Sequence, residues 1–316
     1  MLCLNLRSTN PFLNLAVDEY LLKNSLEEYI ILGINDPSVI IGKHQVAHRE
    51  ADTKYINGNN IPVVRRISGG GTVFHDHGNL NFSIISQSSK GQQVDFRKYT
   101  LPVIRFLATL GVEAYLEGKS DLKVNGQKIS GNAEHVYRER VLHHGTLLFN
   151  TSLAGMNAAI RKDTSNYATR AVGSNPSPVI NLREIIAAEK DINEFRADLL
   201  DFFLNCYPGN RIVQLTDKEI SEIESLADSK YRTWEWNYAY GPEYMFYNRF
   251  ETDGKHYYCR LLVKDGIIRE CKVEGSGSLV DVADKLLGCR HMPGDILRVL
   301  REVNNSLSDS DTYRFF

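Results

Sequence analysis

The feature that most constrains the fold is the segment at 65–86, which reads RRISGGGTVFHDHGNLNFSIIS. Three consecutive glycines at 69–71 lie between the apolar run at 61–64 and the apolar pair at 73–74. The polar stretch at 75–79 then leads into alternating apolar and polar residues at 80–84, which is the pattern of a half-buried strand. The segment therefore predicts a strand, a glycine loop, a polar turn and a second strand.

The glycine loop has the features of an anion-binding site. A glycine backbone adopts positive φ values readily, and successive N–H groups in such a loop bind phosphate or carboxylate. Arg65 and Arg66 precede the loop and carry planar guanidinium groups that suit phosphate oxygens. Three glycines alone are more typical of a tight turn in a sheet. The arginines before them and the histidines His75 and His77 after them favour an anion site.

Length and composition limit the function. The chain has 316 residues, 42% of them hydrophobic and 24% charged, which suits one large domain or two unequal ones. The net charge of −2 gives no overall basic field for nucleic acid, and no apolar run is long enough to span a membrane. The five cysteines are scattered without a CxxC pair, so neither a zinc site nor a disulfide framework is expected. We expect a soluble cytoplasmic protein, with a processed mitochondrial protein as the alternative.

The N-terminal part predicts a helix that packs on a sheet. Asn10 and Pro11 suit the start of a helix, and apolar residues then recur at helical spacing. Short β-rich runs at 29–34 and 39–41 follow, separated by a turn signal. Lys43 comes directly after the second run, as either a solvated surface cation or a ligand contact.

A helix is next expected at 95–110. Pro102 is tolerable there only if it lies near the first turn, because proline lacks the N–H that a helix interior needs. Gly111 suits the end of this helix, and a strand is expected at 112–116.

A second informative stretch centres on the dipeptide Asn125-Gly126, which is a strong two-residue hairpin signal. The hairpin places Asp121 on one strand and Lys128 on its partner. The small residues at 130–133 predict a second loop directly after Lys128.

A further strand is expected at 141–149. It contains His143 and His144, which must point to opposite faces, so at most one of them faces a site. The polar segment at 168–178 is either a lid or a plain surface loop.

The C-terminal third predicts a second, smaller α+β module. A capping box begins at Thr216, and the helix after it is expected to end near Lys230. We place a domain boundary at 238–245. The elements expected on either side are helices at 151–162 and 190–206 before it, strands at 246–250, 257–263 and 267–273, and helices at 279–287 and 293–303.

These residue types together suit the adenylation of a carboxylate. A positioned lysine screens the repulsion between a carboxylate and a phosphate, and a nearby aspartate can hold Mg²⁺ together with phosphate oxygens. The Walker pattern and the GxSxG elbow are absent, which disfavours a P-loop NTPase and a serine hydrolase. Neither glycine-rich stretch contains a cysteine, which argues against a thioester intermediate there.

The chain resembles the two-domain lipoate–protein ligases. The resemblance rests on RRISGGGTVFHDHGN at 65–79, KISGNA at 128–133 and HHGTLL at 143–148, supported by NPFLNLA at 10–16 and VIIG at 39–42. It implies an α/β fold with mixed sheets and flanking helices. The expected domains are a biotin/lipoate protein ligase-like catalytic domain at 1–240 and a small α+β accessory domain at 241–316.

The resemblance also implies roles for individual residues. Lys128 and Asp121 would be catalytic, and Asp121 is the possible Mg²⁺ ligand. The substrate- or adenylate-binding residues would be Arg66, Ser68, Gly70, Gly71, Val73, His75, Gly131, Ala133 and His144. The segment at 169–182 resembles the adenylate-binding loop of the family. His135 stands where some members have arginine, and Ala171 and Gly173 replace more polar residues in the loop.

The implied reaction activates lipoate with ATP and Mg²⁺ to lipoyl-AMP. The lipoyl group then passes to a lysine on a carrier, either a lipoyl domain of a 2-oxo acid dehydrogenase or the glycine-cleavage carrier protein. The protein is expected to be a monomer that binds neither nucleic acid nor membrane. Two alternatives stay open: a transferase that takes octanoyl or lipoyl groups from a carrier or from preformed lipoyl-AMP, and a non-catalytic ligand-binding module.

Overall fold

The computed structural model describes residues 1–89, 94–252, 254–304, 307 and 309–316. Their contacts divide the chain into two compact units, each containing segments that are distant in sequence. Unit 1 comprises Met1–Lys43, Val64–Met156 and Ser174–Arg232, and unit 2 comprises His44–Val63, Asn157–Gly173 and Thr233–Phe316.

Unit 1 is built on an eight-stranded mixed sheet. Its strands, in spatial order, are β12 (Arg211–Val213), β1 (Leu2–Asn5), β2 (Tyr29–Ile34), β6 (Asn79–Gln87), β10 (Arg140–Leu148), β9 (Gln127–Tyr137), β8 (Asp121–Val124) and β7 (Tyr115–Glu117). β1 runs parallel to β12 and β2, and the remaining neighbours are antiparallel. A second sheet has the order β4 (Val63–Arg65), β3 (Ser38–Ile41) and β5 (Val73–His75). The expected mixed α/β architecture is therefore confirmed.

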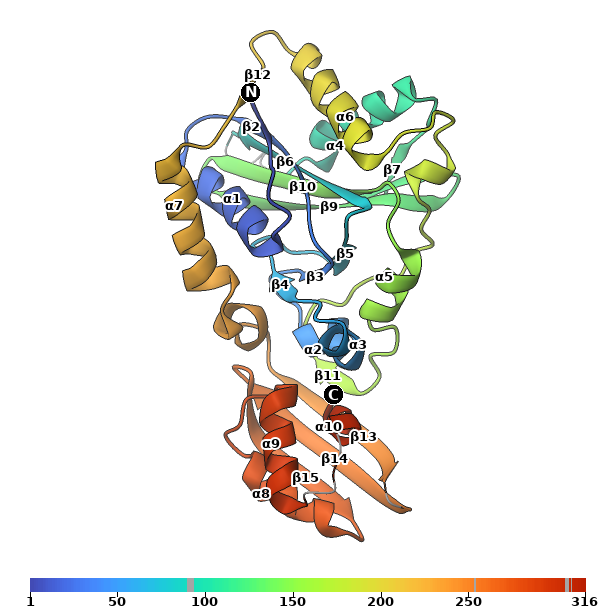
Figure 1. The fold of residues 1–316 in the computed structure, drawn as a ribbon, viewed down its shortest axis with the longest axis vertical. Coiled ribbons are helices and arrows are strands. Elements are labelled where there is room, and N and C mark those ends of the chain that lie inside the picture. The colour runs from blue at the N-terminus through green and yellow to red at the C-terminus, as the bar shows by residue number, and fades with distance from the viewer. Residues whose placement is uncertain (90–93, 253, 305–306, 308) are drawn as a thin grey trace. The chain divides into compact units, whose positions relative to one another are not determined.

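The two faces of the large sheet are covered by different helices. α4 (Phe96–Thr109) and α6 (Ile192–Cys206) pack on one face, and α1 (Pro11–Asn24) lies on the other (Figure 1). The core beneath α4 and α6 contains Phe82 and Ile84 of β6. Ser83, between them, points the other way because side chains alternate along a strand, and its hydroxyl donates to Asp18 of α1 at 2.9 Å.

The predicted helix starts are confirmed where capping residues signalled them. The Asn10 side chain accepts from the first two backbone N–H groups after Pro11, and Thr216 forms a capping box with Glu219. Unit 1 also contains α7 (Asp217–Leu226), which is followed by a π-helical turn at Ala227–Tyr231, and α5 (Leu153–Ala159) has residues in both units.

The expectation for Pro102 was wrong, because this residue lies inside α4 and beyond its first turn. Proline in a helix interior costs about 3 kcal/mol. The apolar face of α4, which includes Val103, Phe106 and Leu107, is buried in the hydrophobic core, and the free energy of that burial offsets the cost of the proline. Gly111 follows the helix with φ +76°, and β7 is shorter and begins later than the strand expected at 112–116.

Unit 2 has an antiparallel sheet and a core of its own. The strand order is β11 (Tyr167–Thr169), β13 (Tyr244–Thr252), β14 (Lys255–Lys264) and β15 (Ile267–Gly275). Its helices are α2 (Ala47–Glu50), α3 (Thr53–Gly58), α8 (Val282–Leu286), α9 (Pro293–Val303) and α10 (Asp309–Thr312). The three C-terminal strands and the helix at 293–303 are confirmed, and the helix expected at 279–287 is a 3₁₀ turn followed by the short α8.

His291 joins β13 to the C-terminal residues inside unit 2. Its Nδ1 accepts from the Tyr244 hydroxyl at 2.6 Å, and its Nε2 donates to the Phe315 carbonyl oxygen at 2.6 Å. The ring also stacks on Phe316, with 4.4 Å between centroids. Burial lowers the pKa of His291 from 6.5 to about 4, so the folded protein keeps this ring neutral at pH 7.

This neutral histidine predicts a loss of stability in acid. Between pH 6.5 and about pH 4 the unfolded chain takes up a proton at His291 and the folded chain does not, so stability falls as the pH falls. At pH 5 the loss from this residue is about 2 kcal/mol relative to pH 7.5. Urea unfolding of His291→Gln at both pH values should show a pH dependence smaller by that amount. His256→Gln, which changes an exposed histidine of the same unit, should leave the pH dependence unchanged.

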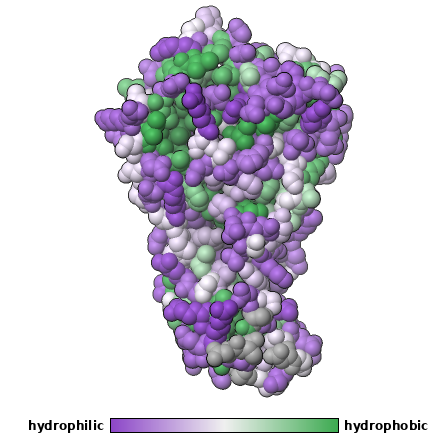
Figure 2. All heavy atoms as spheres, in the orientation of Figure 1, coloured by the Kyte–Doolittle hydropathy of each residue, from purple (hydrophilic) through white to green (hydrophobic). Residues whose placement is uncertain are grey.

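No helix among the residues that the structure describes is long and apolar enough to cross a membrane. Figure 2 shows hydrophilic side chains over most of the visible face, interrupted by smaller hydrophobic areas.

Candidate active site

The glycine loop is built around the side chain of Arg66, which is 6% exposed. The guanidinium Nη2 donates to the carbonyl oxygens of Gly69 at 2.6 Å and Gly71 at 2.7 Å, and Nε donates to Ser68 Oγ at 3.0 Å. Burial lowers the pKa of Arg66 to about 10, which still leaves it charged at neutral pH. The fork expected to bind phosphate therefore holds the loop itself in shape. Gly70 adopts φ +89°, a conformation that favours glycine.

The loop packs tightly against the end of β3. A Cβ atom on Gly42 would lie 2.1 Å from the carbonyl oxygen of Gly70, so only glycine fits there. The Lys43 N–H donates to the Ser68 carbonyl at 2.8 Å, and the Arg66 N–H donates to the Ile41 carbonyl at 3.0 Å. These contacts fix the position of the loop relative to the small sheet.

Lys128 and Asp121 lie across the β8–β9 hairpin from each other. Asn125 and Gly126 at its tip have φ values of 50° and 78°, which confirms the predicted two-residue turn. The Lys128 Nζ atom is 2.9 Å from Asp121 Oδ1, and both side chains remain about a quarter exposed. They are thus accessible to a ligand.

The loop expected at 130–133 was wrong, because these residues continue strand β9. A bulge precedes them: the pairing passes from Leu122 with Ser130 to Lys123 with Lys128, so Ile129 is an extra residue. Regular alternation would put Lys128 and Gly131 on opposite faces. The bulge puts them on one face, because the Lys128 Nζ lies 3.1 Å from the position that a Gly131 Cβ would take.

The glycine loop and the hairpin meet at this face. A Cβ atom on Gly70 would lie 3.7 Å from the Ala133 Cβ, and one on Gly131 would lie 3.9 Å from a methyl carbon of Val73. The two small-residue stretches of the sequence are therefore in contact, and Lys128 lies beside them. The absence of side chains at the glycines leaves room for a ligand to approach the backbone.

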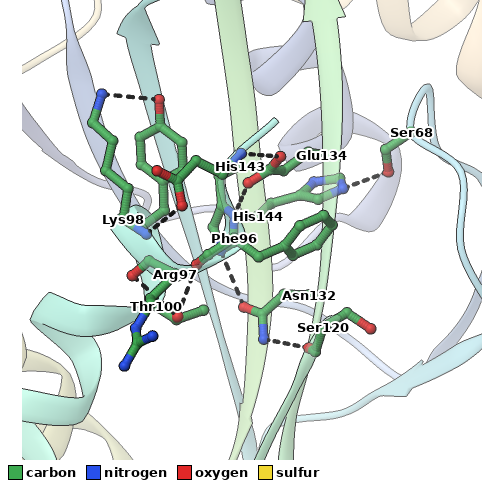
Figure 3. A network of polar contacts seen from close by, with 12 residues as sticks. Ser68, Phe96, Arg97, Lys98, Thr100, Ser120, Asn132, Glu134, His143 and His144 are labelled. Carbon is green, nitrogen blue, oxygen red and sulfur yellow. Dashed lines mark hydrogen bonds and ion pairs between the residues drawn. The ribbon is translucent and has the colours of Figure 1, made fainter. Parts of the chain in front are cut away.

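The adjacent histidines of β10 point to opposite faces, as the strand pattern predicted. His143 lies on the core face, where Nδ1 is 2.9 Å from Glu134 and Nε2 is 3.2 Å from Asn132 (Figure 3). His144 lies on the other face, with Nε2 2.6 Å from Ser68 Oγ (Figure 3). Only His144 therefore reaches the glycine loop.

His75, at the end of β5, is 6% exposed. Its Nδ1 lies 2.9 Å from the side-chain amide nitrogen of Asn35. Burial is the main reason why its pKa falls to about 3, and the nearby Arg66 and His144 add to the effect. The ring is therefore neutral at pH 7.

The segment that follows Gly173 lies against the same face. Ser174 Oγ accepts from the Thr72 N–H at 2.8 Å, next to the glycine loop. Further along, the Pro178 carbonyl accepts from the Lys128 N–H at 2.8 Å, and the Ile180 N–H donates to the Lys128 carbonyl at 3.1 Å. Both backbone polar groups of Lys128 are therefore bonded to this segment. The second half of the loop at 168–178 packs against the site through these bonds and is not a plain surface loop.

Comparison with known proteins identifies the family. The family model of the lipoyl protein ligase A/B catalytic domain matches residues 10–204, more than half of the chain. The chain belongs to this family. Lipoate–protein ligase 1 of Staphylococcus aureus is 37% identical over 98% of this chain and 93% of its own length. The Bacillus subtilis lipoate-protein ligase LplJ is 35% identical over 95% of this chain and 93% of its own length.

Solved structures agree with this assignment to the lipoyl protein ligase A/B family. A Thermoplasma acidophilum protein solved with bound lipoic acid is 29% identical, with a TM-score of 0.65 over 75% of this chain and 98% of that chain. A lipoate-protein ligase A solved with ATP is also 29% identical, with a TM-score of 0.63 over 75% of this chain and 97% of that chain. The fold is that of the lipoate ligases.

Three residues near the site of this family member were not found by sequence reasoning: Asp18, Asn35 and Ser174. Asp18 Oδ2 lies 3.3 Å from His144 Nδ1, and Asn35 contacts His75. A signal for Asp18 was present, since it lies four residues after Asn14 among apolar residues of the helix and both would share one face. Asn35 and Ser174 lie in turn and loop segments, where nothing in the local pattern separates a site residue from a turn former.

Proposed function

We propose that this chain is an ATP-dependent lipoate–protein ligase, and that the face formed by Lys128, Asp121 and the glycine loop is its active site. The observation that carries the proposal is the bulge at Ile129, which turns Lys128 toward Gly131 and the loop. An ammonium group in this position can contact a carboxylate oxygen and a phosphate oxygen at once, which reduces their repulsion and stabilises charge that develops in the transition state.

The reaction has two steps. A carboxylate oxygen of lipoate attacks the α-phosphorus of ATP, an O–P bond forms, and pyrophosphate leaves. The amine of a carrier lysine then attacks the acyl carbon, AMP leaves with the bonding electron pair, and the amine loses a proton to give the amide. Lys128 serves both steps because the phosphate and the acyl carbonyl stay next to each other throughout.

The other members of the site are proposed to bind the lipoyl-adenylate. Arg66 and Ser68 maintain the loop, and the remaining ligand-binding residues line the same face. That set is Gly70, Gly71, Val73, His75, Gly131, Ala133 and His144. The lysine and aspartate of the hairpin act on the reacting groups.

Mg²⁺ is proposed to bind at Asp121 together with phosphate oxygens of ATP. Within the described residues there is no group of three or more histidine, cysteine or acidic side chains that could hold a metal by themselves. Asp121 Oδ1 is paired with Lys128, and the described part of the chain offers no hydrogen-bond partner to Oδ2. A single free carboxylate oxygen suits Mg²⁺, which usually takes one or two carboxylates plus phosphates and water. The ion would neutralise phosphate charge.

The proposed partners are carrier proteins with an exposed lysine: lipoyl domains of 2-oxo acid dehydrogenases and the glycine-cleavage carrier protein. We also propose a cytoplasmic monomer with a catalytic domain at 1–240 and an accessory domain at 241–316. The absence of an activated thiol supports a ligase over a cysteine-dependent acyltransferase. Burial raises the pKa of all five cysteine thiols, so none is poised as a thiolate.

One observation keeps a second candidate, a transferase that uses preformed lipoyl-AMP. His135 stands where some family members have arginine. Burial and the nearby Lys43 and Lys23 lower its pKa to about 4, so it is neutral at pH 7 and provides no charge for a phosphate.

Lipoate-dependent exchange of radiolabelled pyrophosphate into ATP tests the first step alone. We expect exchange that requires lipoate and Mg²⁺, and a mass increase of a lipoyl domain by one lipoyl group when the domain is added. Transfer from synthetic lipoyl-AMP without any exchange would support the transferase instead. Failure of both reactions would contradict the proposed function.

A further inference from the structure

Helix α1 presents two polar side chains to the site, one turn apart. Asn14 is 8% exposed and Asp18 is 6% exposed, in a helix whose other buried positions are mostly apolar. Residues four apart lie on the same face of a helix. Each of the two begins a chain of hydrogen bonds that includes a histidine of the site. The direction of every bond in these chains can be derived from which atoms can only donate or only accept.

The first chain runs from Asn14 to His75. The Asn14 amide nitrogen lies 2.9 Å from the Ser8 carbonyl oxygen, which can only accept, so this nitrogen donates. It also donates to Asn35 Oδ1 at 2.7 Å, which turns the Asn35 amide nitrogen toward His75 Nδ1 at 2.9 Å. Nδ1 must therefore accept, and the proton of a neutral His75 lies on Nε2.

The second chain runs from Asp18 to Ser68. A carboxylate can only accept, so His144 Nδ1, at 3.3 Å from Asp18 Oδ2, carries a proton. The Ser68 hydroxyl, 2.6 Å away, then donates to His144 Nε2. At the far end Arg66 Nε donates to Ser68 Oγ at 3.0 Å, which agrees with a serine that accepts from arginine and donates to histidine.

We propose that Asn14, acting through Asn35, and Asp18 are positioning residues that hold the two site histidines in opposite tautomers, so that only His75 offers an N–H group to the substrate. The role in catalysis rests on the proposed ligase function, while the tautomers themselves do not. His144 has both nitrogens occupied by Asp18 and Ser68, so it has no free N–H group to offer.

The N–H group at Nε2 of His75 determines which substrate group can bind next to it, because that group must be a hydrogen-bond acceptor. Within the described part of the chain, Nε2 has no hydrogen-bond acceptor, and the ring is 6% exposed. A donor aimed at the ligand contributes most when the ligand provides an acceptor. A carboxylate, carbonyl or phosphate oxygen of the substrate provides one. A neutral donor does this without adding a second positive charge next to Arg66.

The tautomers can be measured directly on the full-length protein with ¹⁵N-labelled histidine. Long-range ¹H–¹⁵N spectra distinguish protonated from unprotonated ring nitrogens, and His75→Gln and His144→Gln assign the two signals by their loss. We expect a proton on Nε2 of His75 and on Nδ1 of His144 at pH 7. The opposite tautomer at either ring, or an exchanging mixture, would overturn the proposal. This wild-type measurement needs no activity and no stable variant of the positioning residues.

Two variants then test the positioning residues. Asn35→Asp places an acceptor beside His75 Nδ1, so the His75 proton should move to Nδ1 and KM for lipoate in the exchange reaction should rise about tenfold. Asp18→Asn should change the His144 signal and leave that of His75 in place. The matched control is Asp36→Asn, which changes an exposed carboxylate 2.8 Å from His77 and should affect neither site histidine.

The outcomes separate the two proposals. Unchanged tautomers in both Asn35→Asp and Asp18→Asn would overturn the positioning role even if the enzyme is active. The expected tautomers in a protein that shows no pyrophosphate exchange would support the positioning role and contradict the ligase function. A kcat effect without a change in tautomer would mean that the residues act only through general structure, which also contradicts the proposal.

Discussion

Replacing Lys128 with alanine is expected to lower lipoate-dependent ATP–pyrophosphate exchange by about 100-fold or more. Loss of one donor aimed at developing negative charge typically costs about 100- to 1,000-fold in rate. Transfer from synthetic lipoyl-AMP should fall as well, because the same ammonium group serves both steps. The free energy of unfolding should change by less than about 1 kcal/mol, since the partly exposed pair with Asp121 is worth little to stability.

A matched control lies directly across the hairpin. Lys123 pairs with Lys128 in the strand register and bonds to Glu117. Lys123→Ala removes the same side chain from the same surface and should leave both half-reactions within about twofold of wild type, an allowance for small electrostatic effects between exposed charges. Rates for both reactions and urea unfolding curves for both variants provide the comparison. Equal losses in the two variants, or full activity of Lys128→Ala in a folded protein, would rule out the catalytic role of Lys128.

Replacing Gly42, which follows β3 and packs against the glycine loop, with alanine is expected to disrupt that loop. The added methyl group would lie 2.1 Å from the Gly70 carbonyl oxygen, which is a backbone atom that cannot rotate away. The loop or the end of β3 must move, at a cost of about 1–3 kcal/mol in the free energy of unfolding. The Gly69 and Gly71 carbonyl groups that contact Arg66 lie in the same loop and would shift with it. The rate of the exchange reaction should therefore fall by about 100-fold.

Gly69→Ala is the control within the same loop. A Cβ atom there meets nothing within 4 Å, and Gly69 does not have a positive φ angle. This variant should therefore unfold at the same urea concentration as wild type, within about 0.5 kcal/mol. Thermal and urea unfolding compare the two alanine variants. Similar stability of Gly42→Ala and wild type would mean that the loop does not need close contact with β3.

Much of the fold could be predicted from local chemistry. Asn10 with Pro11, and Thr216 with Glu219, identified helix starts, because a capping side chain acts on N–H groups only a few residues away. Asn125 and Gly126 identified the hairpin, because their φ values above zero suit few other residues. The hairpin in turn placed Asp121 opposite the strand of Lys128. The helix expected at 95–110 formed with Pro102 beyond its first turn, since packing of a whole helix face outweighed one unfavourable residue.

The sequence by itself determined the family and the mixed α/β class, and it predicted the residues of the candidate site, because each depends on short-range patterns or on long motifs. Only the tertiary structure decided which contacts those residues make. Arg66 supports the loop from within, and Ile129 is the bulge that turns Lys128 to the same face as Gly131. From a helix distant in sequence, Asp18 contacts His144 directly and Asn14 acts on His75 through Asn35. Strand register and the directions of buried hydrogen bonds depend on partners far along the chain, so no local pattern could reveal them.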